Sequence, residues 1–460
     1  MSLPPSFHYF FFFYVICLLF CVCPIPTHAT VLVAPISKDK SSNLFTLSVF
    51  LKTPIRPTKL FLDLGFLFPW TVCDAGYNSS SFHEITCDPT FCASLGFGAL
   101  SCDNCSDFGP PDPNCVPANL VCGCFPENPV IRTAGSDAVL VDTLALPSTE
   151  GPLVLLPNYT FGCARSTLLK GLPKNVTGLA ALGRSNVSFP AQISASLSSP
   201  RCFALCFPSS SKAPGVAFFG STGPYNVSSF SSSEIDLSKS LIYTPLIVNP
   251  VGVGDTIINY GGNPPSNQHF IGLTSIQVNG KHVPINATLL SIDKDNGFGG
   301  TKISTATPYT LLESSVQKAF TELFVKEAAS SAFNLTITSP VKPFNVCYPA
   351  GDLTVNPAGP VVPTVDLVLN GLKDDVIWRI LGANSMVRVT NKKKGVDLWC
   401  LGFVDGGVNK KTPIVIGGKQ LEDNLLQFDL ETNRLGFTSS LLSRSLSCAD
   451  FNVTDSTHKS

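Results

Sequence analysis

Short apolar runs, most of them bounded by glycine, proline or asparagine, recur along the whole chain. They are rich in valine, isoleucine, phenylalanine and threonine, a composition typical of β-strands. Representative runs are NLFTLSVFLKT, TKLFLDLG, GPLVLLPNYTFGC, PVVPTVDLVL and TPIVIGG. The 35 glycines and 37 prolines are spread along the chain, which fits short strands joined by turns. The pattern therefore predicts a mostly-β protein.

Two segments depart from this pattern and predict helices. In residues 314–329 the apolar side chains fall on one face, as in an amphipathic helix. Ser314 and Gln317 can form a capping box at its start. The segment PAQISASLS, directly after Phe189, is a second and weaker candidate. The basic run NKKKG at residues 391–395 lies between two strand-like segments, which predicts a solvated hairpin tip rather than a polyanion site.

The apolar pattern contains a weak internal duplication. In the first half LFLDLGF is followed downstream by GLAALGR at residues 178–184, and in the second half TKISTAT at residues 301–307 is followed by TPIVIGG at residues 412–418. Each half thus combines a loop after an apolar strand with an apolar segment that could pack against that loop. Such repetition predicts two homologous lobes that meet at a cleft. The serine-rich stretch 228–240 marks the expected boundary.

The first 29 residues predict a signal peptide. The run HYFFFFYVICLLFCVC is strongly apolar but short for a membrane span, and it leads into PIPTHA, a small-residue cleavage context. The segment before the apolar run lacks lysine and arginine, so an uncleaved anchor remains the alternative. No later stretch is apolar enough to span a membrane. We therefore expect secretion to the extracellular space and no membrane association after cleavage. The expected units are a signal peptide at 1–29 and lobes at 30–235 and 236–460.

Cysteine usage agrees with an oxidising compartment. Three of the 17 cysteines lie in the expected signal peptide, and the other 14 could form up to seven disulfides. Eight of them crowd between Cys73 and Cys124, so we expect a disulfide-rich insertion at 73–124 within the first lobe. A zinc site built on CDNC and CGC is the alternative, but thiols oxidise outside the cell.

Nine Asn-x-Ser/Thr sequons predict surface positions in a secreted chain. They begin at Asn78, Asn104, Asn158, Asn175, Asn186, Asn226, Asn286, Asn334 and Asn452. We expect glycosylation at all of them except Asn104, whose sequon has a cysteine in the middle.

Composition argues against several classes of ligand. The 31 basic and 32 acidic residues nearly balance, whereas nucleic-acid binding requires a basic surface. None of the histidines outside the expected signal peptide has metal-ligand spacing. GFGG at residues 297–300 lacks the lysine and the helix start of a phosphate loop. We therefore expect no cofactor, no metal and no nucleic-acid partner.

One carboxylate stands out because Asp63 lies inside the apolar run KLFLDLGFLFPW. A lone buried aspartate is unfavourable unless it is hydrogen-bonded or reactive. The segments DLGF at 63–66 and STAT at 304–307 resemble the paired Asp-Thr/Ser-Gly loops of the pepsin-like aspartic proteases, whose two aspartates share a proton and activate a water. The resemblance implies an all-β, bilobal pepsin-like fold with a few short helices. Ser304 occupies the second aspartate position, so the resemblance implies that Asp63 is a catalytic remnant with a structural role.

Within that fold the chain resembles one plant group most densely: the extracellular dermal glycoproteins, xyloglucan-specific endoglucanase inhibitors, xylanase inhibitors and basic 7S globulins. The matching segments are DLGFLFPWTVCD, CGCFPENPV, GLAALGR, STATPYTLLESSVQKAF, WRILGANSMVRV, WCLGFVDGG and IVIGGKQLEDNLLQFDLETNRLGF. The group implies no proteolysis and, in several members, inhibition of microbial glycoside hydrolases. It also implies a usual set of twelve cysteines. The resemblance to the pepsin fold implies the pair Cys347–Cys400 in the second lobe, and Cys206–Cys448 is a further pair that we expect. The two additional cysteines, Cys124 and Cys202, would be free to pair with each other.

The resemblance also suggests how an inhibitor would act. A glycosidase cleft carries two carboxylates, and the planar guanidinium of arginine can bind them. In the xyloglucanase inhibitors one arginine lies four residues before the last cysteine, which is Arg444 here. Pro357 occupies the position of a second arginine. The xylanase inhibitors use a terminal histidine, and none lies between His282 and His458, so a xyloglucan-specific endo-β-glucanase is the more favoured target.

Two other functions remain open at this stage. The chain could be an aspartic-type endopeptidase with a degenerate site, because a fold does not fix a function. It could also be a storage or hormone-binding glycoprotein that resembles the basic 7S globulins, although its two methionines favour storage little. In the inhibitor reading the partner is a microbial or plant glycoside hydrolase, and we expect this protein to be a monomer.

Overall fold

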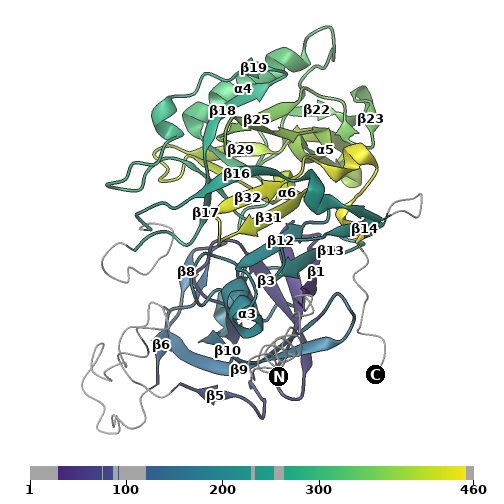
Figure 1. Ribbon diagram of the computed structural model, residues 1–460. Helices are drawn as coiled ribbons and strands as arrows, with labels where there is room; N and C mark the ends of the chain where they lie inside the picture. Colours follow the sequence, from purple (N-terminus) through teal and green to yellow (C-terminus); the bar gives the residue numbers. More distant parts are fainter. Residues whose placement is uncertain are drawn as a thin grey trace, which may run out of the picture.

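The computed structural model of this chain describes residues 30–74, 76–85, 92, 121–228, 234–252 and 264–451. The expected signal peptide, most of the cysteine-rich insertion and the sequons at Asn104 and Asn452 lie outside these residues. Figure 1 shows two β-rich lobes with few helices, one built mainly from the first half of the chain and one mainly from the second. The predicted all-β, bilobal fold is therefore confirmed. None of the helices in the described residues is long and apolar enough to cross a membrane.

The strands follow the short apolar runs of the sequence. Those of the first half are β1 (Leu32–Lys38), β2 (Phe45–Leu51), β3 (Arg56–Asp63), β4 (Trp70–Val72), β5 (His83–Glu84), β6 (Gly123–Cys124), β7 (Glu127–Asn128), β8 (Thr133–Ala134), β9 (Asp137–Pro147), β10 (Leu153–Ala164), β11 (Gly178–Ala181), β12 (Cys202–Cys206), β13 (Gly215–Phe219) and β14 (Asn226–Ser228).

The second half continues in the same way. Its strands are β15 (Glu234–Asp236), β16 (Ile242–Ile247), β17 (His269–Ile271), β18 (Leu273–Val278), β19 (Lys281–His282), β20 (Thr301–Ile303), β21 (Thr310–Glu313), β22 (Cys347–Pro349), β23 (Val355–Asn356), β24 (Gly359–Pro360), β25 (Val365–Leu369), β26 (Val376–Ile380), β27 (Met386–Asn391), β28 (Val396–Leu401), β29 (Phe403–Gly407), β30 (Ile414–Ile416), β31 (Leu425–Asp429) and β32 (Arg434–Phe437). Strands β27 and β28 form the predicted hairpin around the NKKKG run.

The described helices are few, as the sequence predicts. They are α3 (Phe189–Leu197), α4 (Ser314–Ala328), α5 (Gly382–Ser385) and α6 (Gly418–Leu421). Both predicted helices are confirmed as α3 and α4, but the predicted capping box at the start of α4 is wrong. The Glu313 carboxylate caps the helix by accepting the Ser315 N–H at 2.8 Å. Ser314 is already helical, and its hydroxyl donates instead to Asp405.

The internal duplication is confirmed by strand pairing. In the first lobe β11 runs parallel to β3 and antiparallel to β4, and β10 runs parallel to β4. In the second lobe β30 runs parallel to β20 and antiparallel to β21, and β29 runs parallel to β21. The two lobes therefore repeat one crossing pattern. The GLAALGR and TPIVIGG segments supply the strand that packs beside each candidate loop.

The two lobes share one sheet. Strand β12 of the first lobe pairs antiparallel with β31 of the second, with Phe203 opposite Phe428. The sheet continues through β13 to β1 on one side and through β32 to β16 on the other. Phe203 and Phe428 stack with ring centroids 4.8 Å apart, and both belong to a buried apolar cluster that extends through both lobes. Backbone pairing and apolar burial therefore join the lobes into one body.

Four disulfides lie within the described residues: Cys73–Cys163, Cys92–Cys122, Cys206–Cys448 and Cys347–Cys400. The last two are the pairs expected from the sequence, Cys347–Cys400 by its resemblance to the pepsin fold and Cys206–Cys448 as a further expectation. The suggested bond between Cys124 and Cys202 is wrong, because both are buried free thiols in separate places. Cys124 packs in the apolar cluster around Trp70, whereas Cys202 lies opposite Asp429 in the shared sheet. The chain therefore forms fewer than the seven disulfides that its cysteine count allows.

Candidate functional site

The two loops of the duplicated pattern meet where the lobes join. Asp63 is the last residue of β3, and Ser304 directly follows β20 at the corresponding place in the second lobe. The Leu64 amide of the first loop donates to Thr305 Oγ1 of the second loop at 3.1 Å. Leu64 and Thr305 are fully buried. This hydrogen bond fixes the two candidate loops against each other across the lobe boundary.

Asp63 is held by its own loop. Its side chain is buried, and Oδ2 accepts hydrogen bonds from the Gly65 amide at 2.9 Å and the Phe66 amide at 2.6 Å. Burial raises the pKa of Asp63, and the two hydrogen bonds and the charge of Lys302 oppose this shift. The burial that the apolar flanks of Asp63 predicted is therefore present. The backbone donors explain how a carboxyl group can remain there.

Ser304 occupies the counterpart position but makes different contacts. Its Oγ accepts the Ala306 N–H at 3.2 Å, and its own amide donates to Ile416 of β30 at 2.9 Å. A proton shared between two carboxylates requires an acid at each position, and a serine hydroxyl does not ionise in the same range. Asp63 and Ser304 therefore supply one carboxylate rather than two.

A buried histidine lies beside these loops, at a position for which the sequence predicted no functional role. His269 of β17 is fully buried, and its Nε2 donates to the carbonyl oxygen of Leu182 at 2.8 Å. Burial lowers the pKa of His269 to about 3. The carbonyl only accepts, so Nε2 carries a proton, and the lowered pKa favours the neutral ring with that single proton near pH 7. His269 is thus a packed lobe-to-lobe contact. Within the described part of the chain, no group of three acidic, histidine or cysteine side chains is arranged to hold a metal.

The two expected inhibitory residues lie on the surface of the second lobe, on separate elements. Arg444 ends the short 3-10 turn η7 (Leu441–Arg444), is exposed, and donates from Nη1 to the hydroxyl of Ser240 at 3.1 Å. Pro357 is exposed in the turn between β23 and β24, next to the half-exposed Val355. Their role in binding a partner stays a prediction.

The sequons in the described residues are all on the surface. The asparagines at these positions are exposed: Asn78, Asn158, Asn175, Asn186, Asn226, Asn286 and Asn334. Each could accept a glycan without disturbing the core.

The two lobes repeat one strand crossing, and a candidate loop from each lobe meets the other at the lobe boundary. These features define a pepsin-like protein. Family models give the finer assignment: one described as "Xylanase inhibitor N-terminal" matches residues 45–221, and one described as "Xylanase inhibitor C-terminal" matches residues 268–439. The chain belongs to this xylanase inhibitor family. This confirms the resemblance to the plant group of dermal glycoproteins, glycosidase inhibitors and basic 7S globulins.

Relatives support the same assignment along nearly the whole chain. A Glycine max protein named "Probable aspartic proteinase GIP1" is 53% identical over 432 residues, covering 93% of each chain. The crystal structure of EDGP matches with a TM-score of 0.82 and 42% identity, over 92% of this chain and 98% of that chain. Conglutin gamma, a basic 7S globulin from lupine seeds, matches with a TM-score of 0.71 and 31% identity, over 92% and 98%. Similar relatives therefore carry proteinase and globulin names alike.

Proposed function

We propose that this chain is a secreted, proteolytically inactive protein that binds and inhibits a cell-wall-degrading glycoside hydrolase. The observation that carries the first part is Ser304 at the second aspartate position of a pepsin-like fold. The family membership, with both halves matching xylanase inhibitor models, supports the second part. A role in plant defence would follow from inhibition of a microbial enzyme.

The absence of proteolysis follows from the acid–base chemistry. An aspartic protease needs one ionised and one protonated carboxyl group that activate a water between them. The Asp63 carboxyl is buried and already accepts hydrogen bonds from the amides of its own loop, and Ser304 cannot hold the shared proton. A degenerate endopeptidase is the alternative that the proteinase name of the Glycine max relative favours. Incubating the protein with an unfolded substrate at pH 3 to 6 separates the two, since pepstatin-sensitive cleavage would contradict our proposal.

Arg444 is the residue we propose for the inhibitory contact. Its guanidinium lies at an exposed surface, carries a permanent charge, and can bond the paired carboxylates of a glycosidase cleft. Its hydrogen bond to Ser240 is exposed and easily exchanged for a stronger, charge-assisted one. Pro357 cannot supply a second charge, so any contact from that turn would be apolar. A xyloglucan-specific endo-β-glucanase is the proposed target.

Secretion is part of the proposal because the features of the chain agree on it. The apolar segment at 1–29 reads as a signal peptide, the described disulfides require oxidising conditions, and the described sequons are exposed. The extracellular wall space is where a wall-degrading hydrolase would be met.

The test is a titration of the purified glycoprotein against a fungal xyloglucan-specific endoglucanase, followed by reducing-sugar release. We expect stoichiometric inhibition that Arg444→Ala weakens at least tenfold, because truncating a paired interfacial arginine typically costs more than about 2 kcal/mol. Arg56→Ala is the matched control, since Arg56 is exposed on the first lobe at the start of β3. No inhibition at micromolar protein, or equal loss with both variants, would contradict the proposal.

A cavity favours the second candidate, a protein that binds a small apolar compound such as a hormone. The cavity has a volume of about 570 Å³, within the usual range for small-molecule sites. Apolar side chains of the second lobe line much of it, among them Ile247, Ile271, Leu273, Leu290 and Ile292. Fluorescence displacement of an apolar dye by wall or seed extracts would detect such a ligand. If inhibition fails and displacement succeeds, this reading replaces the first.

A further inference from the structure

The segment that carries Arg444 is a closed loop. The Leu446 amide donates back to the Leu441 carbonyl at 3.1 Å, and Ser445 between them has a positive φ of 55°. Leu441 and Leu446 are both buried in one apolar cluster, while Arg444 remains exposed. This arrangement resembles the hydrogen-bonded end of a helix, with apolar residues fixing both sides of the turn. The loop is therefore compact, and its orientation depends on how its two ends are attached.

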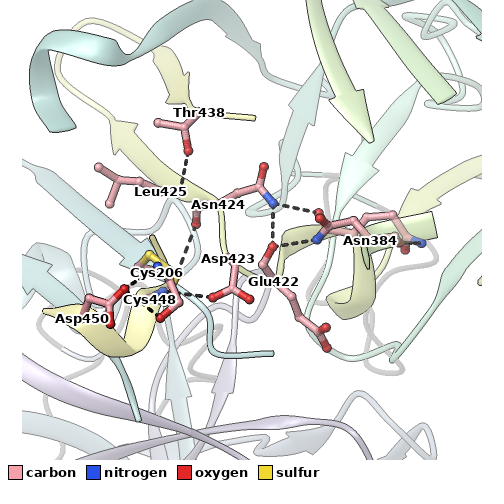
Figure 2. Close-up of a disulfide and its surroundings, with 11 residues drawn as sticks. Cys206, Asn384, Glu422, Asp423, Asn424, Leu425, Thr438, Cys448 and Asp450 are labelled. Carbon is pink, nitrogen blue, oxygen red and sulfur yellow. Dashed lines mark hydrogen bonds between the residues drawn. A yellow bond between two sulfur atoms is a disulfide. The ribbon is translucent and has the colours of Figure 1, made fainter. Parts of the chain in front are cut away.

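One residue, Asp423, holds both ends of this loop. Its backbone carbonyl accepts the Leu441 N–H at 2.7 Å, and its Oδ1 accepts the Cys448 N–H at 2.9 Å. Figure 2 shows the Asp423 carboxylate directed at the Cys448 backbone, beside the disulfide. Asp423 is only 1% exposed, and its own amide donates to Phe207 of the first lobe at 2.8 Å. The residue thus links the loop to the body of both lobes.

The peptide before Asp423 is fixed as well. The carbonyl oxygen of Glu422 accepts the side-chain amides of Asn384 at 2.6 Å and Asn424 at 2.7 Å (Figure 2). Asn424 is in turn bonded by the indole N–H of the buried Trp378. These buried contacts leave the backbone of Asp423 little freedom, so its carbonyl and carboxylate are presented in set directions.

The disulfide alone would not fix the loop in the same way. Cys448 is bonded to Cys206, whose strand β12 lies beside β31 with Cys206 opposite Leu425. A disulfide restrains the sulfur and Cβ positions, but the peptide of Cys448 can still rotate about its backbone dihedrals. The hydrogen bond from the Cys448 amide to the buried Asp423 carboxyl restrains that rotation, and with it the direction in which the preceding loop leaves.

We infer that Asp423 is the positioning residue for Arg444: its side chain orients the loop 441–448 so that the guanidinium is presented to the partner. The inference rests on the proposed inhibitory role of Arg444 and adds a residue that touches no partner. Its side chain acts through the loop, so its removal should weaken inhibition only while Arg444 is present.

The test compares two substitutions that both tolerate the backbone at this position, where φ is 48°. Asp423→Gly removes the acceptor without steric strain, and Asp423→Asn keeps an oxygen in place, because glycine and asparagine adopt positive φ most readily. We expect the glycine variant to raise the inhibition constant about tenfold and the asparagine variant less than threefold. Hydrogen exchange followed by mass spectrometry should show faster exchange of the amides in 441–448 for the glycine variant.

A double-mutant cycle with Arg444→Ala separates positioning from a general loss of stability. In the Arg444→Ala background, Asp423→Gly should produce no further change in inhibition. An equal additional loss in that background, or wild-type inhibition and exchange in the glycine variant, would overturn the inference. If the glycine variant does not fold, the asparagine variant decides: because it keeps the acceptor oxygen, inhibition within threefold of wild type would support the inference, and a loss as large as that of Arg444→Ala would overturn it.

Failure of the proposed function gives a different pattern. A wild-type protein that does not inhibit the endoglucanase contradicts the inhibitory role. The Asp423→Gly variant then still reports on the loop through hydrogen exchange alone. Exchange in 441–448 as slow as in wild type would show that the Asp423 side chain does not hold the loop.

Discussion

Acid should destabilise this fold through His269, and the effect can be worked out from its surroundings. The imidazole is fully buried between the lobes, packed against Phe428 with centroids 4.6 Å apart, and bonded to the Leu182 carbonyl. Protonation would place a charge there and would add an Nδ1–H that meets no acceptor among the described residues. Burial accordingly lowers the pKa of His269 from its ordinary value of 6.5 to about 3.

The sign and size follow from proton linkage. Because the folded pKa is depressed, the unfolded chain binds more protons below pH 6.5, so the contribution to stability is full above that pH and is lost as pH falls toward 3. Each pH unit in this window corresponds to about 1.4 kcal/mol. Between pH 7 and pH 4.5, His269 alone should therefore lower the free energy of unfolding by about 2–3 kcal/mol.

The measurement is denaturant unfolding at pH 7.0 and 4.5 with disulfides intact, followed by the fluorescence of the buried Trp70 and Trp378. His269→Gln keeps an N–H for the Leu182 carbonyl but cannot be protonated, so it should lose about 2–3 kcal/mol less than wild type on acidification. His282→Gln is the control, since His282 is exposed on β19. If wild type and His269→Gln lose the same stability within about 0.5 kcal/mol, the reasoning is refuted.

Substitutions at two further residues, Thr305 and Asp63, test the junction of the candidate loops. Thr305→Val leaves the buried Leu64 amide without its acceptor and should lower the free energy of unfolding by about 1–3 kcal/mol, whereas Thr305→Ser should cost less than half of that; equal losses in denaturant titrations would contradict this account. Asp63→Ala leaves the Gly65 and Phe66 amides unbonded and should cost about 2–4 kcal/mol at pH 7. Asp63→Asn keeps an acceptor and should be milder at that pH. Because the pKa of Asp63 is raised in the folded state, protonation of Asp63 favours folding. This contribution to stability is full at low pH and is lost as pH rises through the folded pKa. Thermal melts of the asparagine variant that show the pH dependence of wild type would contradict this assignment.

The sequence predicts those parts of the fold in which a local pattern carries the information. Neighbouring residues are enough to predict three features: the helical period of α4, the hairpin of β27 and β28, and the duplicated loop with the strand that packs beside it. The cap of α4 was predicted wrongly because serine is a preferred cap residue and glutamate is not, whereas in the structure the Ser314 hydroxyl bonds to Asp405 and Glu313 caps the helix. The remote partner of a hydroxyl cannot be read from its neighbours.

The shared sheet and the position of Asp423 could not be predicted, for a related reason. The pairing of β12 with β31 joins two apolar strands that lie far apart in the sequence, and many apolar runs of this sequence could pair equally well. A signal for Asp423 was present, since it lies two residues before a buried strand, whereas Asp63 ends one. Both are carboxylates beside apolar strands, and each is explained by backbone amides that it binds.

The pairing of β12 with β31 has a consequence for synthesis. Cys206, at the end of β12, precedes Cys448 by 242 residues, and β31 lies close to the latter. At translation rates of 5 to 20 residues per second, β12 waits on the order of 10 to 50 seconds for its partner strand. During that interval one edge of β12 has no partner strand and Cys206 has no partner thiol. We therefore expect the growing chain to be most prone to aggregation before the second lobe is complete, because an unpaired apolar strand edge is then exposed.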